Sequence, residues 1–165
     1  MSAMSEEGAG ALVHRPLYTA EQRARRDASP WTLVQGLLAP LQFLIFLVSL
    51  VLVLRYLATG AGYEAATASV VVKTAALLLI MVTGAIWEKA VFGQYLFAHA
   101  FFWEDVFSFA VIALHLAYIA GLVTGALTTT DLMWVALAAY AAYVINAGQF
   151  ILKLRRARLD QVGAA

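Results

Sequence analysis

Four long apolar segments alternate with short polar ones along this chain. They cover roughly residues 33–58, 67–90, 103–124 and 131–152. A helix needs about 20 apolar residues to cross a hydrocarbon core of about 30 Å, and each segment is long enough. Lipid offers no hydrogen-bond partners to the backbone, so the segments are expected to be helices. The pattern predicts an all-α, polytopic membrane protein with four transmembrane helices.

Polar stretches flank these segments and divide the chain. We predict a polar N-terminal tail over 1–30, a four-helix transmembrane domain over 31–154 and a basic C-terminal tail over 155–165. Within the first tail, 19–27 is predicted to form a short surface helix. The Ser-Pro pair that follows has the N-cap and first-turn pattern of a helix start. Because the first thirty residues are polar, no cleavable signal peptide is expected.

Composition narrows the classes of function. Hydrophobic residues make up 63% of the chain and the mean hydropathy is +0.81, whereas soluble domains contain about 45–50% apolar residues. The chain contains no cysteine, which excludes disulfides, thiolate metal sites and a cysteine nucleophile. The formal net charge of +1 argues against nucleic acid as a partner.

The basic residues predict the orientation in the membrane. The connection over 89–102 carries Lys89, whereas the connections over 59–66 and 125–130 carry no lysine or arginine. The remaining charges flank the first and last segments, at Arg15, Arg23, Arg25 and Arg26 and at Lys153, Arg155, Arg156 and Arg158. By the positive-inside rule, both termini and the 89–102 loop are expected to be cytoplasmic.

Polar residues recur on one face of the first segment. Gln35, Gln42, Ser49 and Tyr56 stand at seven-residue spacing, close to two helical turns. One interpretation is a polar seam that holds the helices together. The other is that Gln35 or Gln42 lines a ligand cavity. In the second segment, Lys73 is expected to extend along the helix towards the interface.

Ionisable and aromatic side chains gather around the predicted 89–102 loop. The second segment ends with Trp87 and Glu88, and the third begins with Phe101-Phe102-Trp103-Glu104-Asp105. A carboxyl group in an apolar, aromatic setting tends to keep its proton, which suits a general acid. Alternatively, the carboxylates stabilise a helix N-terminus and the aromatic residues form the usual interfacial belt.

Helical spacing joins further groups to this set. Ser108, His115 and Tyr118 follow Glu104 at offsets of four, eleven and fourteen residues, so the four share one stripe. For Asp105 alone the interfacial interpretation is favoured, but for Glu88, Glu104 and His115 taken together a function is favoured. The candidate catalytic residues are therefore Glu104, Glu88, His115 and Asp105, with Glu104 as the first choice of proton donor.

The histidines and amides leave alternatives open. His115 lies about three turns inside the third segment, where it is either a hydrogen-bonded packing residue or a ligand to a porphyrin metal. A bis-histidine haem needs a second deep histidine, but His14 and His99 lie outside the segments. A cytochrome b interpretation is therefore disfavoured. Asn146 and Gln149 fit either an interhelical hydrogen bond or a ligand contact.

Several stretches resemble the bacteriochlorophyllide C3-vinyl hydratases, small integral membrane proteins of anoxygenic phototrophic bacteria. The resemblance covers roughly 17–160 and runs through loops and spans alike. It is carried by 17–19 (LYT), 23–36 (RARRDASPWTLVQG), 86–108 (IWEKAVFGQYLFAHAFFWEDVFS) and 143–154 (YVINAGQFILKL). The family pattern usually has proline where this chain has His99, so His99 is not expected to be catalytic. The resemblance assigns no catalytic residue.

The resemblance implies a hydro-lyase of bacteriochlorophyll biosynthesis. Water adds across the C3-vinyl group of chlorophyllide a or a bacteriochlorophyllide and gives a 3-(1-hydroxyethyl) product, with no cofactor. The enzyme is expected in the bacterial inner, intracytoplasmic membrane, with its active site towards the cytoplasm and other pigment-biosynthesis enzymes as candidate neighbours. The rival interpretation is a non-catalytic pigment carrier or photosystem assembly factor, which would need no proton donor. A quinone-binding or transporter subunit is disfavoured because paired half-helices are missing.

The macrocycle is expected to lie at the cytoplasmic interface. Its predicted contacts are Trp87, Trp103, Phe101, Phe102, Gln42 and Asn146. We expect no metal bound by the protein itself, although His115 is a candidate ligand for the magnesium of the substrate.

Overall fold

The structure is a computed structural model that describes residues 16–163. Over this range it contains helices and no strand, and four of the helices are long and apolar enough to cross a membrane. The helices are α1 (Ala20–Ala28), α2 (Pro30–Thr59), α3 (Tyr63–Phe92), α4 (Phe102–Thr124) and α5 (Thr129–Val162). The all-α prediction and the four apolar spans are confirmed. Half of the predicted N-terminal tail, Arg15 and His14 included, lies outside the described residues.

Local sequence explains where the helices begin and end. Thr19 and Gln22 form a capping box at the start of α1, in which each side chain accepts a hydrogen bond from the other residue's backbone N–H. Ser29 caps α2 and Pro30 occupies its first turn, as predicted. At the other ends, Gly60 and Gly93 adopt positive φ values of 70° and 86°. Glycine takes this left-handed conformation without a steric penalty and so ends α2 and α3.

The last helix is longer than hydropathy predicted. The apolar segment ends near residue 152, but α5 continues to Val162 and takes the basic residues of the predicted tail into the helix. Lysine, arginine, leucine and alanine are good helix formers, and no proline or glycine interrupts them before Gly163. The basic side chains therefore stand on a rigid element.

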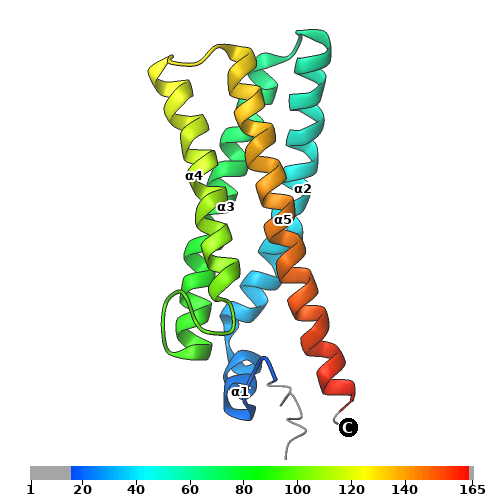
Figure 1. Cartoon of the computed structure of the whole chain (residues 1–165), viewed down its shortest axis with the longest axis vertical. Helices are drawn as coiled ribbons and strands as arrows, with labels where there is room; N and C mark the ends of the chain where they lie inside the picture. The colour runs from blue at the N-terminus through cyan, green and yellow to red at the C-terminus, as the bar shows by residue number, and fades with distance from the viewer. Residues whose placement is uncertain (1–15, 164–165) are drawn as a thin grey trace, which may run out of the picture.

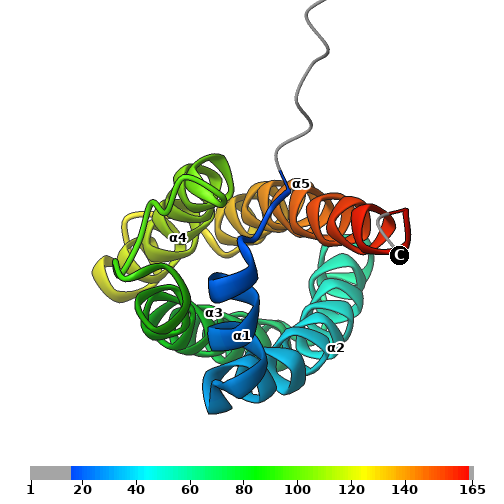
Figure 2. The same ribbon diagram turned by 90° about the horizontal axis from the view of Figure 1, so that it is seen from below.

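The four long helices form two hairpins. α2 packs mainly on α3 and α4 on α5, and the hairpins meet where α2 contacts α5 and α3 contacts α4 (Figure 1). Both described ends of the chain and the α3–α4 loop lie at the same end of the bundle. Seen from that end, α1 crosses the bundle (Figure 2), where it packs against α3.

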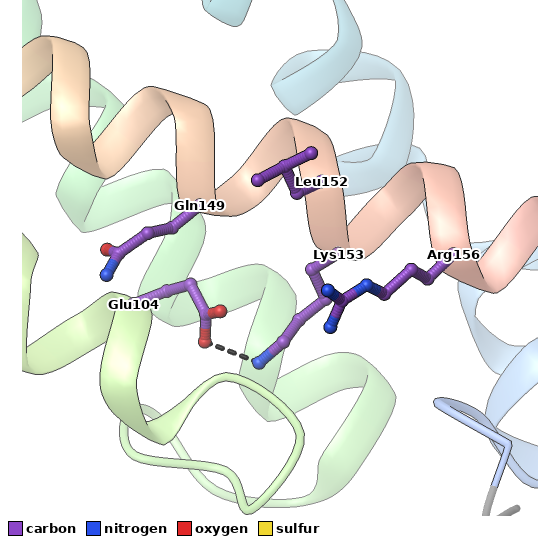
Figure 3. A pocket seen from close by; sticks show the side chains of 5 residues that line it. All are labelled: Glu104, Gln149, Leu152, Lys153 and Arg156. Atoms are coloured by element: carbon purple, nitrogen blue, oxygen red, sulfur yellow. Dashed lines mark hydrogen bonds and ion pairs between the residues drawn. The ribbon is translucent and has the colours of Figure 1, made fainter.

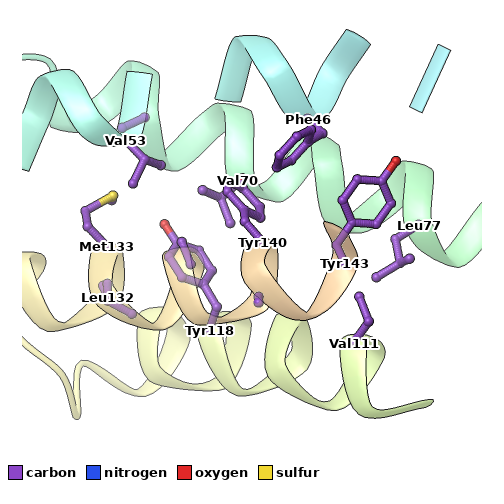
Figure 4. Close-up of a cluster of buried hydrophobic side chains, with 13 residues drawn as sticks. Phe46, Val53, Val70, Leu77, Val111, Tyr118, Leu132, Met133, Tyr140 and Tyr143 are labelled. Atoms are coloured by element: carbon purple, nitrogen blue, oxygen red, sulfur yellow. The ribbon is translucent and has the colours of Figure 1, made fainter. Parts of the chain in front are cut away.

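The core is rich in aromatic residues. Figure 4 shows Phe46, Tyr118, Tyr140 and Tyr143 among the aliphatic side chains that fill the bundle. The Phe46 ring lies 5.4 Å from that of Tyr140 and 5.0 Å from that of Tyr143, measured between centroids. Leucine and valine cover much of the outer surface, as expected for helices that face lipid.

The polar face of α2 forms the seam that one interpretation predicted. Hydroxyl groups on other helices bind three of its four residues, and Gln42 lies buried beside Tyr143. The pairs are Gln35 with Thr83 at 2.7 Å, Ser49 with Ser69 at 2.7 Å and with Tyr140 at 2.5 Å, and Tyr56 with Thr129 at 2.7 Å. These hydrogen bonds join α2 to both α3 and α5.

The prediction for Lys73 was wrong. Its side chain is fully buried and its ammonium nitrogen lies 3.6 Å from the centroid of the Tyr143 ring. Lys73 stands ten residues after the start of α3 at Tyr63, or about 15 Å along the helix axis. It faces the bundle interior at that depth, so its side chain does not reach the interface.

The seam predicts coupling between α2 and α5. In a double-mutant cycle, Ser49→Ala and Tyr140→Phe should show a coupling free energy of about 0.6 kcal/mol, and no more than about 1.7 kcal/mol, because the unfolded chain in the membrane also finds partners. Unfolding in detergent measures it. Thr124→Val combined with Tyr140→Phe is the control, since Thr124 binds its own helix. Strictly additive effects of the Ser49 and Tyr140 changes would contradict the seam.

Candidate functional site

The ionisable residues of the predicted site converge where α3, α4 and α5 meet the α3–α4 loop. Glu88 stands near the end of α3, and Glu104 and Asp105 stand in the first turn of α4. All three carboxyl groups are buried. Lys153 of α5 completes the set, because α5 runs past the start of α4. The structure thus brings three of the four predicted catalytic residues into one cluster.

Glu104 pairs with a lysine that the sequence had suggested only as a membrane-orienting charge. Its carboxylate lies 2.5 Å from the Lys153 ammonium, which also donates to the backbone carbonyl of Ala100. A pocket of about 230 Å³ lies beside this ion pair (Figure 3). Its lining residues are Glu104, Gln149, Leu152, Lys153 and Arg156.

Glu88 and Asp105 hold the loop in place. Glu88 accepts a hydrogen bond from the Ala98 N–H at 3.2 Å, and Asp105 accepts one from the Phe97 N–H at 2.7 Å. Phe97 has a φ of 58°, which is uncommon for a residue other than glycine. The two carboxyl groups also lie close enough to interact electrostatically. Two neighbouring buried carboxylates repel each other, so the pair is suited to holding one proton.

Asn146 links α5 to α4 next to this cluster. Its amide N–H donates to the Ser108 hydroxyl at 2.8 Å, and that hydroxyl donates to the Glu104 backbone carbonyl at 2.8 Å. One of the two open interpretations, the interhelical hydrogen bond, therefore holds for Asn146. Gln149, one turn further along α5, lines the pocket instead.

His115 does not join the carboxyl groups. It follows Glu104 by eleven residues on α4, or about 16 Å along the helix axis, and it is fully buried. Its Nδ1 lies 2.8 Å from the Val111 carbonyl. A carbonyl only accepts, so Nδ1 carries the proton and Nε2 is left as an acceptor in the neutral ring. His99 stands exposed in the loop.

The predicted substrate-binding aromatic residues separate into two groups. Phe101 is buried together with Tyr18, and the partly buried rings of Trp87, Phe92 and Phe150 pack against them. Trp103 and Phe102, by contrast, are 66% and 43% exposed on the outer face of α4. Gln42 lies in the bundle interior and does not line the pocket. The six predicted contacts therefore do not form one surface.

Sequence reasoning passed over Lys153 and Arg156 as site residues, and it left Gln149 undecided. A usable signal was present, because Tyr140, Tyr143, Asn146 and Gln149 recur every three residues and Lys153 follows four later. Such spacing keeps side chains on one side of a helix. Extending the fourth helix beyond its apolar segment would have brought Lys153 into this row.

Comparisons with known proteins cover most of the chain. A sequence model of the 2-vinyl bacteriochlorophyllide hydratase family matches residues 18–156. A Cereibacter sphaeroides protein named 2-vinyl bacteriochlorophyllide hydratase is 71% identical over 154 residues, which are 93% of this chain and 96% of that protein. A Rhodobacter capsulatus protein of the same name is 71% identical over 146 residues, 88% of this chain and 85% of that protein. No solved structure matches the chain. The match extends across loops and helices alike, and the chain belongs to the 2-vinyl bacteriochlorophyllide hydratase family.

Proposed function

We infer that this chain is a hydro-lyase of bacteriochlorophyll biosynthesis. It adds water across the C3-vinyl group of a chlorophyllide or bacteriochlorophyllide and forms a 3-(1-hydroxyethyl) substituent. The observation that carries this inference is the 71% identity, over nearly the whole chain, to two proteins named for that activity. The buried carboxyl groups support it against a pigment carrier, because a carrier needs no proton donor.

The reaction requires one proton to be given and one to be taken back. A proton bonds to the terminal vinyl carbon and leaves a cation on the inner carbon, next to the macrocycle that delocalises the charge. The oxygen of water then bonds to the inner carbon, and the oxygen loses its second proton. Since one water is consumed and no net proton, a single acid–base cluster completes the cycle.

We propose that Glu104 exchanges these protons with the substrate. Of the three carboxyl groups, it is the one that lines the pocket. Asp105 interacts electrostatically with Glu104, with Lys153 and with Glu88. The Glu88–Asp105 pair thus keeps a proton beside Glu104, and Lys153 stabilises Glu104 as an anion after transfer.

The pocket accommodates only part of the substrate. Its volume of about 230 Å³ lies below the roughly 300–1,000 Å³ of clefts that enclose a small ligand. We propose that the vinyl-bearing edge of the macrocycle enters the pocket while its flat face rests in lipid against Trp103 and Phe102. Trp87 and Phe101 do not contact the macrocycle in this arrangement. Their aromatic cluster supports the α3–α4 loop.

The basic residues also bear on the orientation of the protein in the membrane. We propose that the protein lies in the inner, intracytoplasmic membrane with the α3–α4 loop, α1 and the end of α5 in the cytoplasm. The basic residues at this end of the bundle support this orientation.

Changing Glu104 to glutamine tests the proton-transfer role. Glu104→Gln keeps the shape of the side chain and removes the acid, so hydration per folded molecule should fall by about 10² or more. Chromatography of the pigment product measures the rate. Glu64→Gln is the control, because Glu64 lies exposed at the opposite end of the bundle. Near-normal turnover by Glu104→Gln would transfer the role to Glu88 or Asp105.

Reporter fusions test the orientation. A reporter that is active only in the cytoplasm should be active when fused after α5 or before α1, because the basic residues near both ends favour that side. A reporter that is active only in the periplasm should be silent at both positions. Periplasmic activity at either end would overturn the orientation and move the carboxyl cluster to the other face.

A further inference from the structure

The interior of the bundle contains a row of polar atoms that extends inward from the pocket. Within residues 16–163, seven buried side-chain polar atoms have no hydrogen-bond partner, and five of them lie between the pocket and the Lys73–His115 region of the bundle. They are Oε1 of Gln149, Oδ1 of Asn146, Oε1 of Gln42, Nζ of Lys73 and Nε2 of His115, and we call these five residues the polar row. Buried polar atoms in native proteins are nearly always paired, so each of the five requires an explanation.

The polar row leads from the pocket towards the middle of the bundle. Gln149 lines the pocket, and Asn146 lies three residues deeper on α5. Tyr143 lies three residues deeper than Asn146 on α5, and Gln42 of α2 lies beside it. The Tyr143 ring contacts the Lys73 ammonium. Lys73 in turn is close enough to His115 to interact with it electrostatically.

The five atoms do not satisfy one another. The three amide oxygens and Nε2 of His115 are acceptors, whereas Lys73 has three N–H donors and no carboxylate partner among the described residues. Successive members stand on different helices or turns, and none of them bonds to the next. Water both donates and accepts, and a buried water typically makes about three hydrogen bonds to such groups. Water-bridged contacts are nearly as favourable as direct ones.

We propose that the polar row holds a chain of ordered water molecules, which runs from the pocket to Lys73 and His115 and supplies the water used in hydration. The supply of water for hydration rests on the proposed function, whereas the presence of the water chain does not. A flat apolar macrocycle with its edge in the pocket covers the mouth and excludes bulk water. The attacking water then arrives from the protein side, and the chain refills when the product leaves.

The absence of cysteine in the chain gives a direct test of the water chain. Thiol reagents attack the thiolate, which forms in contact with water and not in lipid. Two matched pairs compare an inward position with its lipid-facing neighbour at the same depth: Asn146→Cys with Ile145→Cys, and Gln42→Cys with Leu41→Cys. Both neighbours are exposed on the outer surface of the bundle.

Methanethiosulfonate ethylammonium is the probe, and labelling of the folded protein in detergent is followed by mass spectrometry. The inward cysteines should react about tenfold faster or more than their neighbours, because only they contact water. Equal rates within both pairs would overturn the water chain. No substrate is present, so this result stands even if the proposed function fails.

The supply role is tested at Lys73. Lys73→Met removes the donor that anchors the inner end, so kcat should fall about tenfold or more while KM changes little, because the pocket itself is intact. Lys73→Gln keeps an N–H donor and should retain more of the rate. Lys89→Met is the control, since Lys89 stands exposed at the end of α3.

An unchanged kcat in Lys73→Met would overturn the supply role, and so would a fall in rate that Lys73→Gln does not relieve. If the unmutated chain forms no hydrated product, the proposed function fails instead, and the labelling rates decide the water chain alone.

Discussion

Lipid provides neither hydrogen bonds nor counter-ions, and most of this structure follows from that constraint. The polar groups of the bundle are therefore directed inward, where they meet partners on neighbouring helices. The hydroxyl and amide pairs of α2 join it to α3 and α5, and the Asn146–Ser108 pair joins α5 to α4. The exceptions are informative for the same reason, because Lys73 and His115 keep unpaired atoms at a depth where an unpaired atom is costly.

The same constraint explains the location of the carboxyl cluster. Three carboxyl groups are tolerated near the membrane because backbone N–H groups of the loop and the Lys153 ammonium compensate their charge. The cluster therefore contains one carboxylate paired with a lysine and two further carboxyl groups close to each other. That combination is suited to a reaction in which a proton is first delivered and later recovered. The cluster depends on the extension of α5, because this extension carries Lys153 to the start of α4.

Much of the fold could be predicted from the sequence, because hydrophobic spans, the Ser29–Pro30 start and the terminal glycines are local signals. The convergence of Glu88, Glu104 and Asp105 was also accessible, since all three flank one loop. The partners of these carboxyl groups could not be predicted from the sequence, because the pairing of Glu104 with Lys153 depends on the relative lengths of α4 and α5. The inward direction of Lys73 and the burial of Trp87 depend on helix rotation, which hydropathy leaves undetermined when a helix is apolar all round. The predicted proton-donor role of Glu104 stays a prediction.

The central claim is that this chain alone hydrates a vinyl-bearing chlorophyllide. The most direct measurement is to incubate the purified protein with chlorophyllide a in isotopically labelled water and to analyse the pigment by chromatography and mass spectrometry. We expect a product that is heavier by one molecule of water and carries the labelled oxygen in the C3 substituent. Recovery of unchanged pigment, with folded protein and verified substrate, would contradict it.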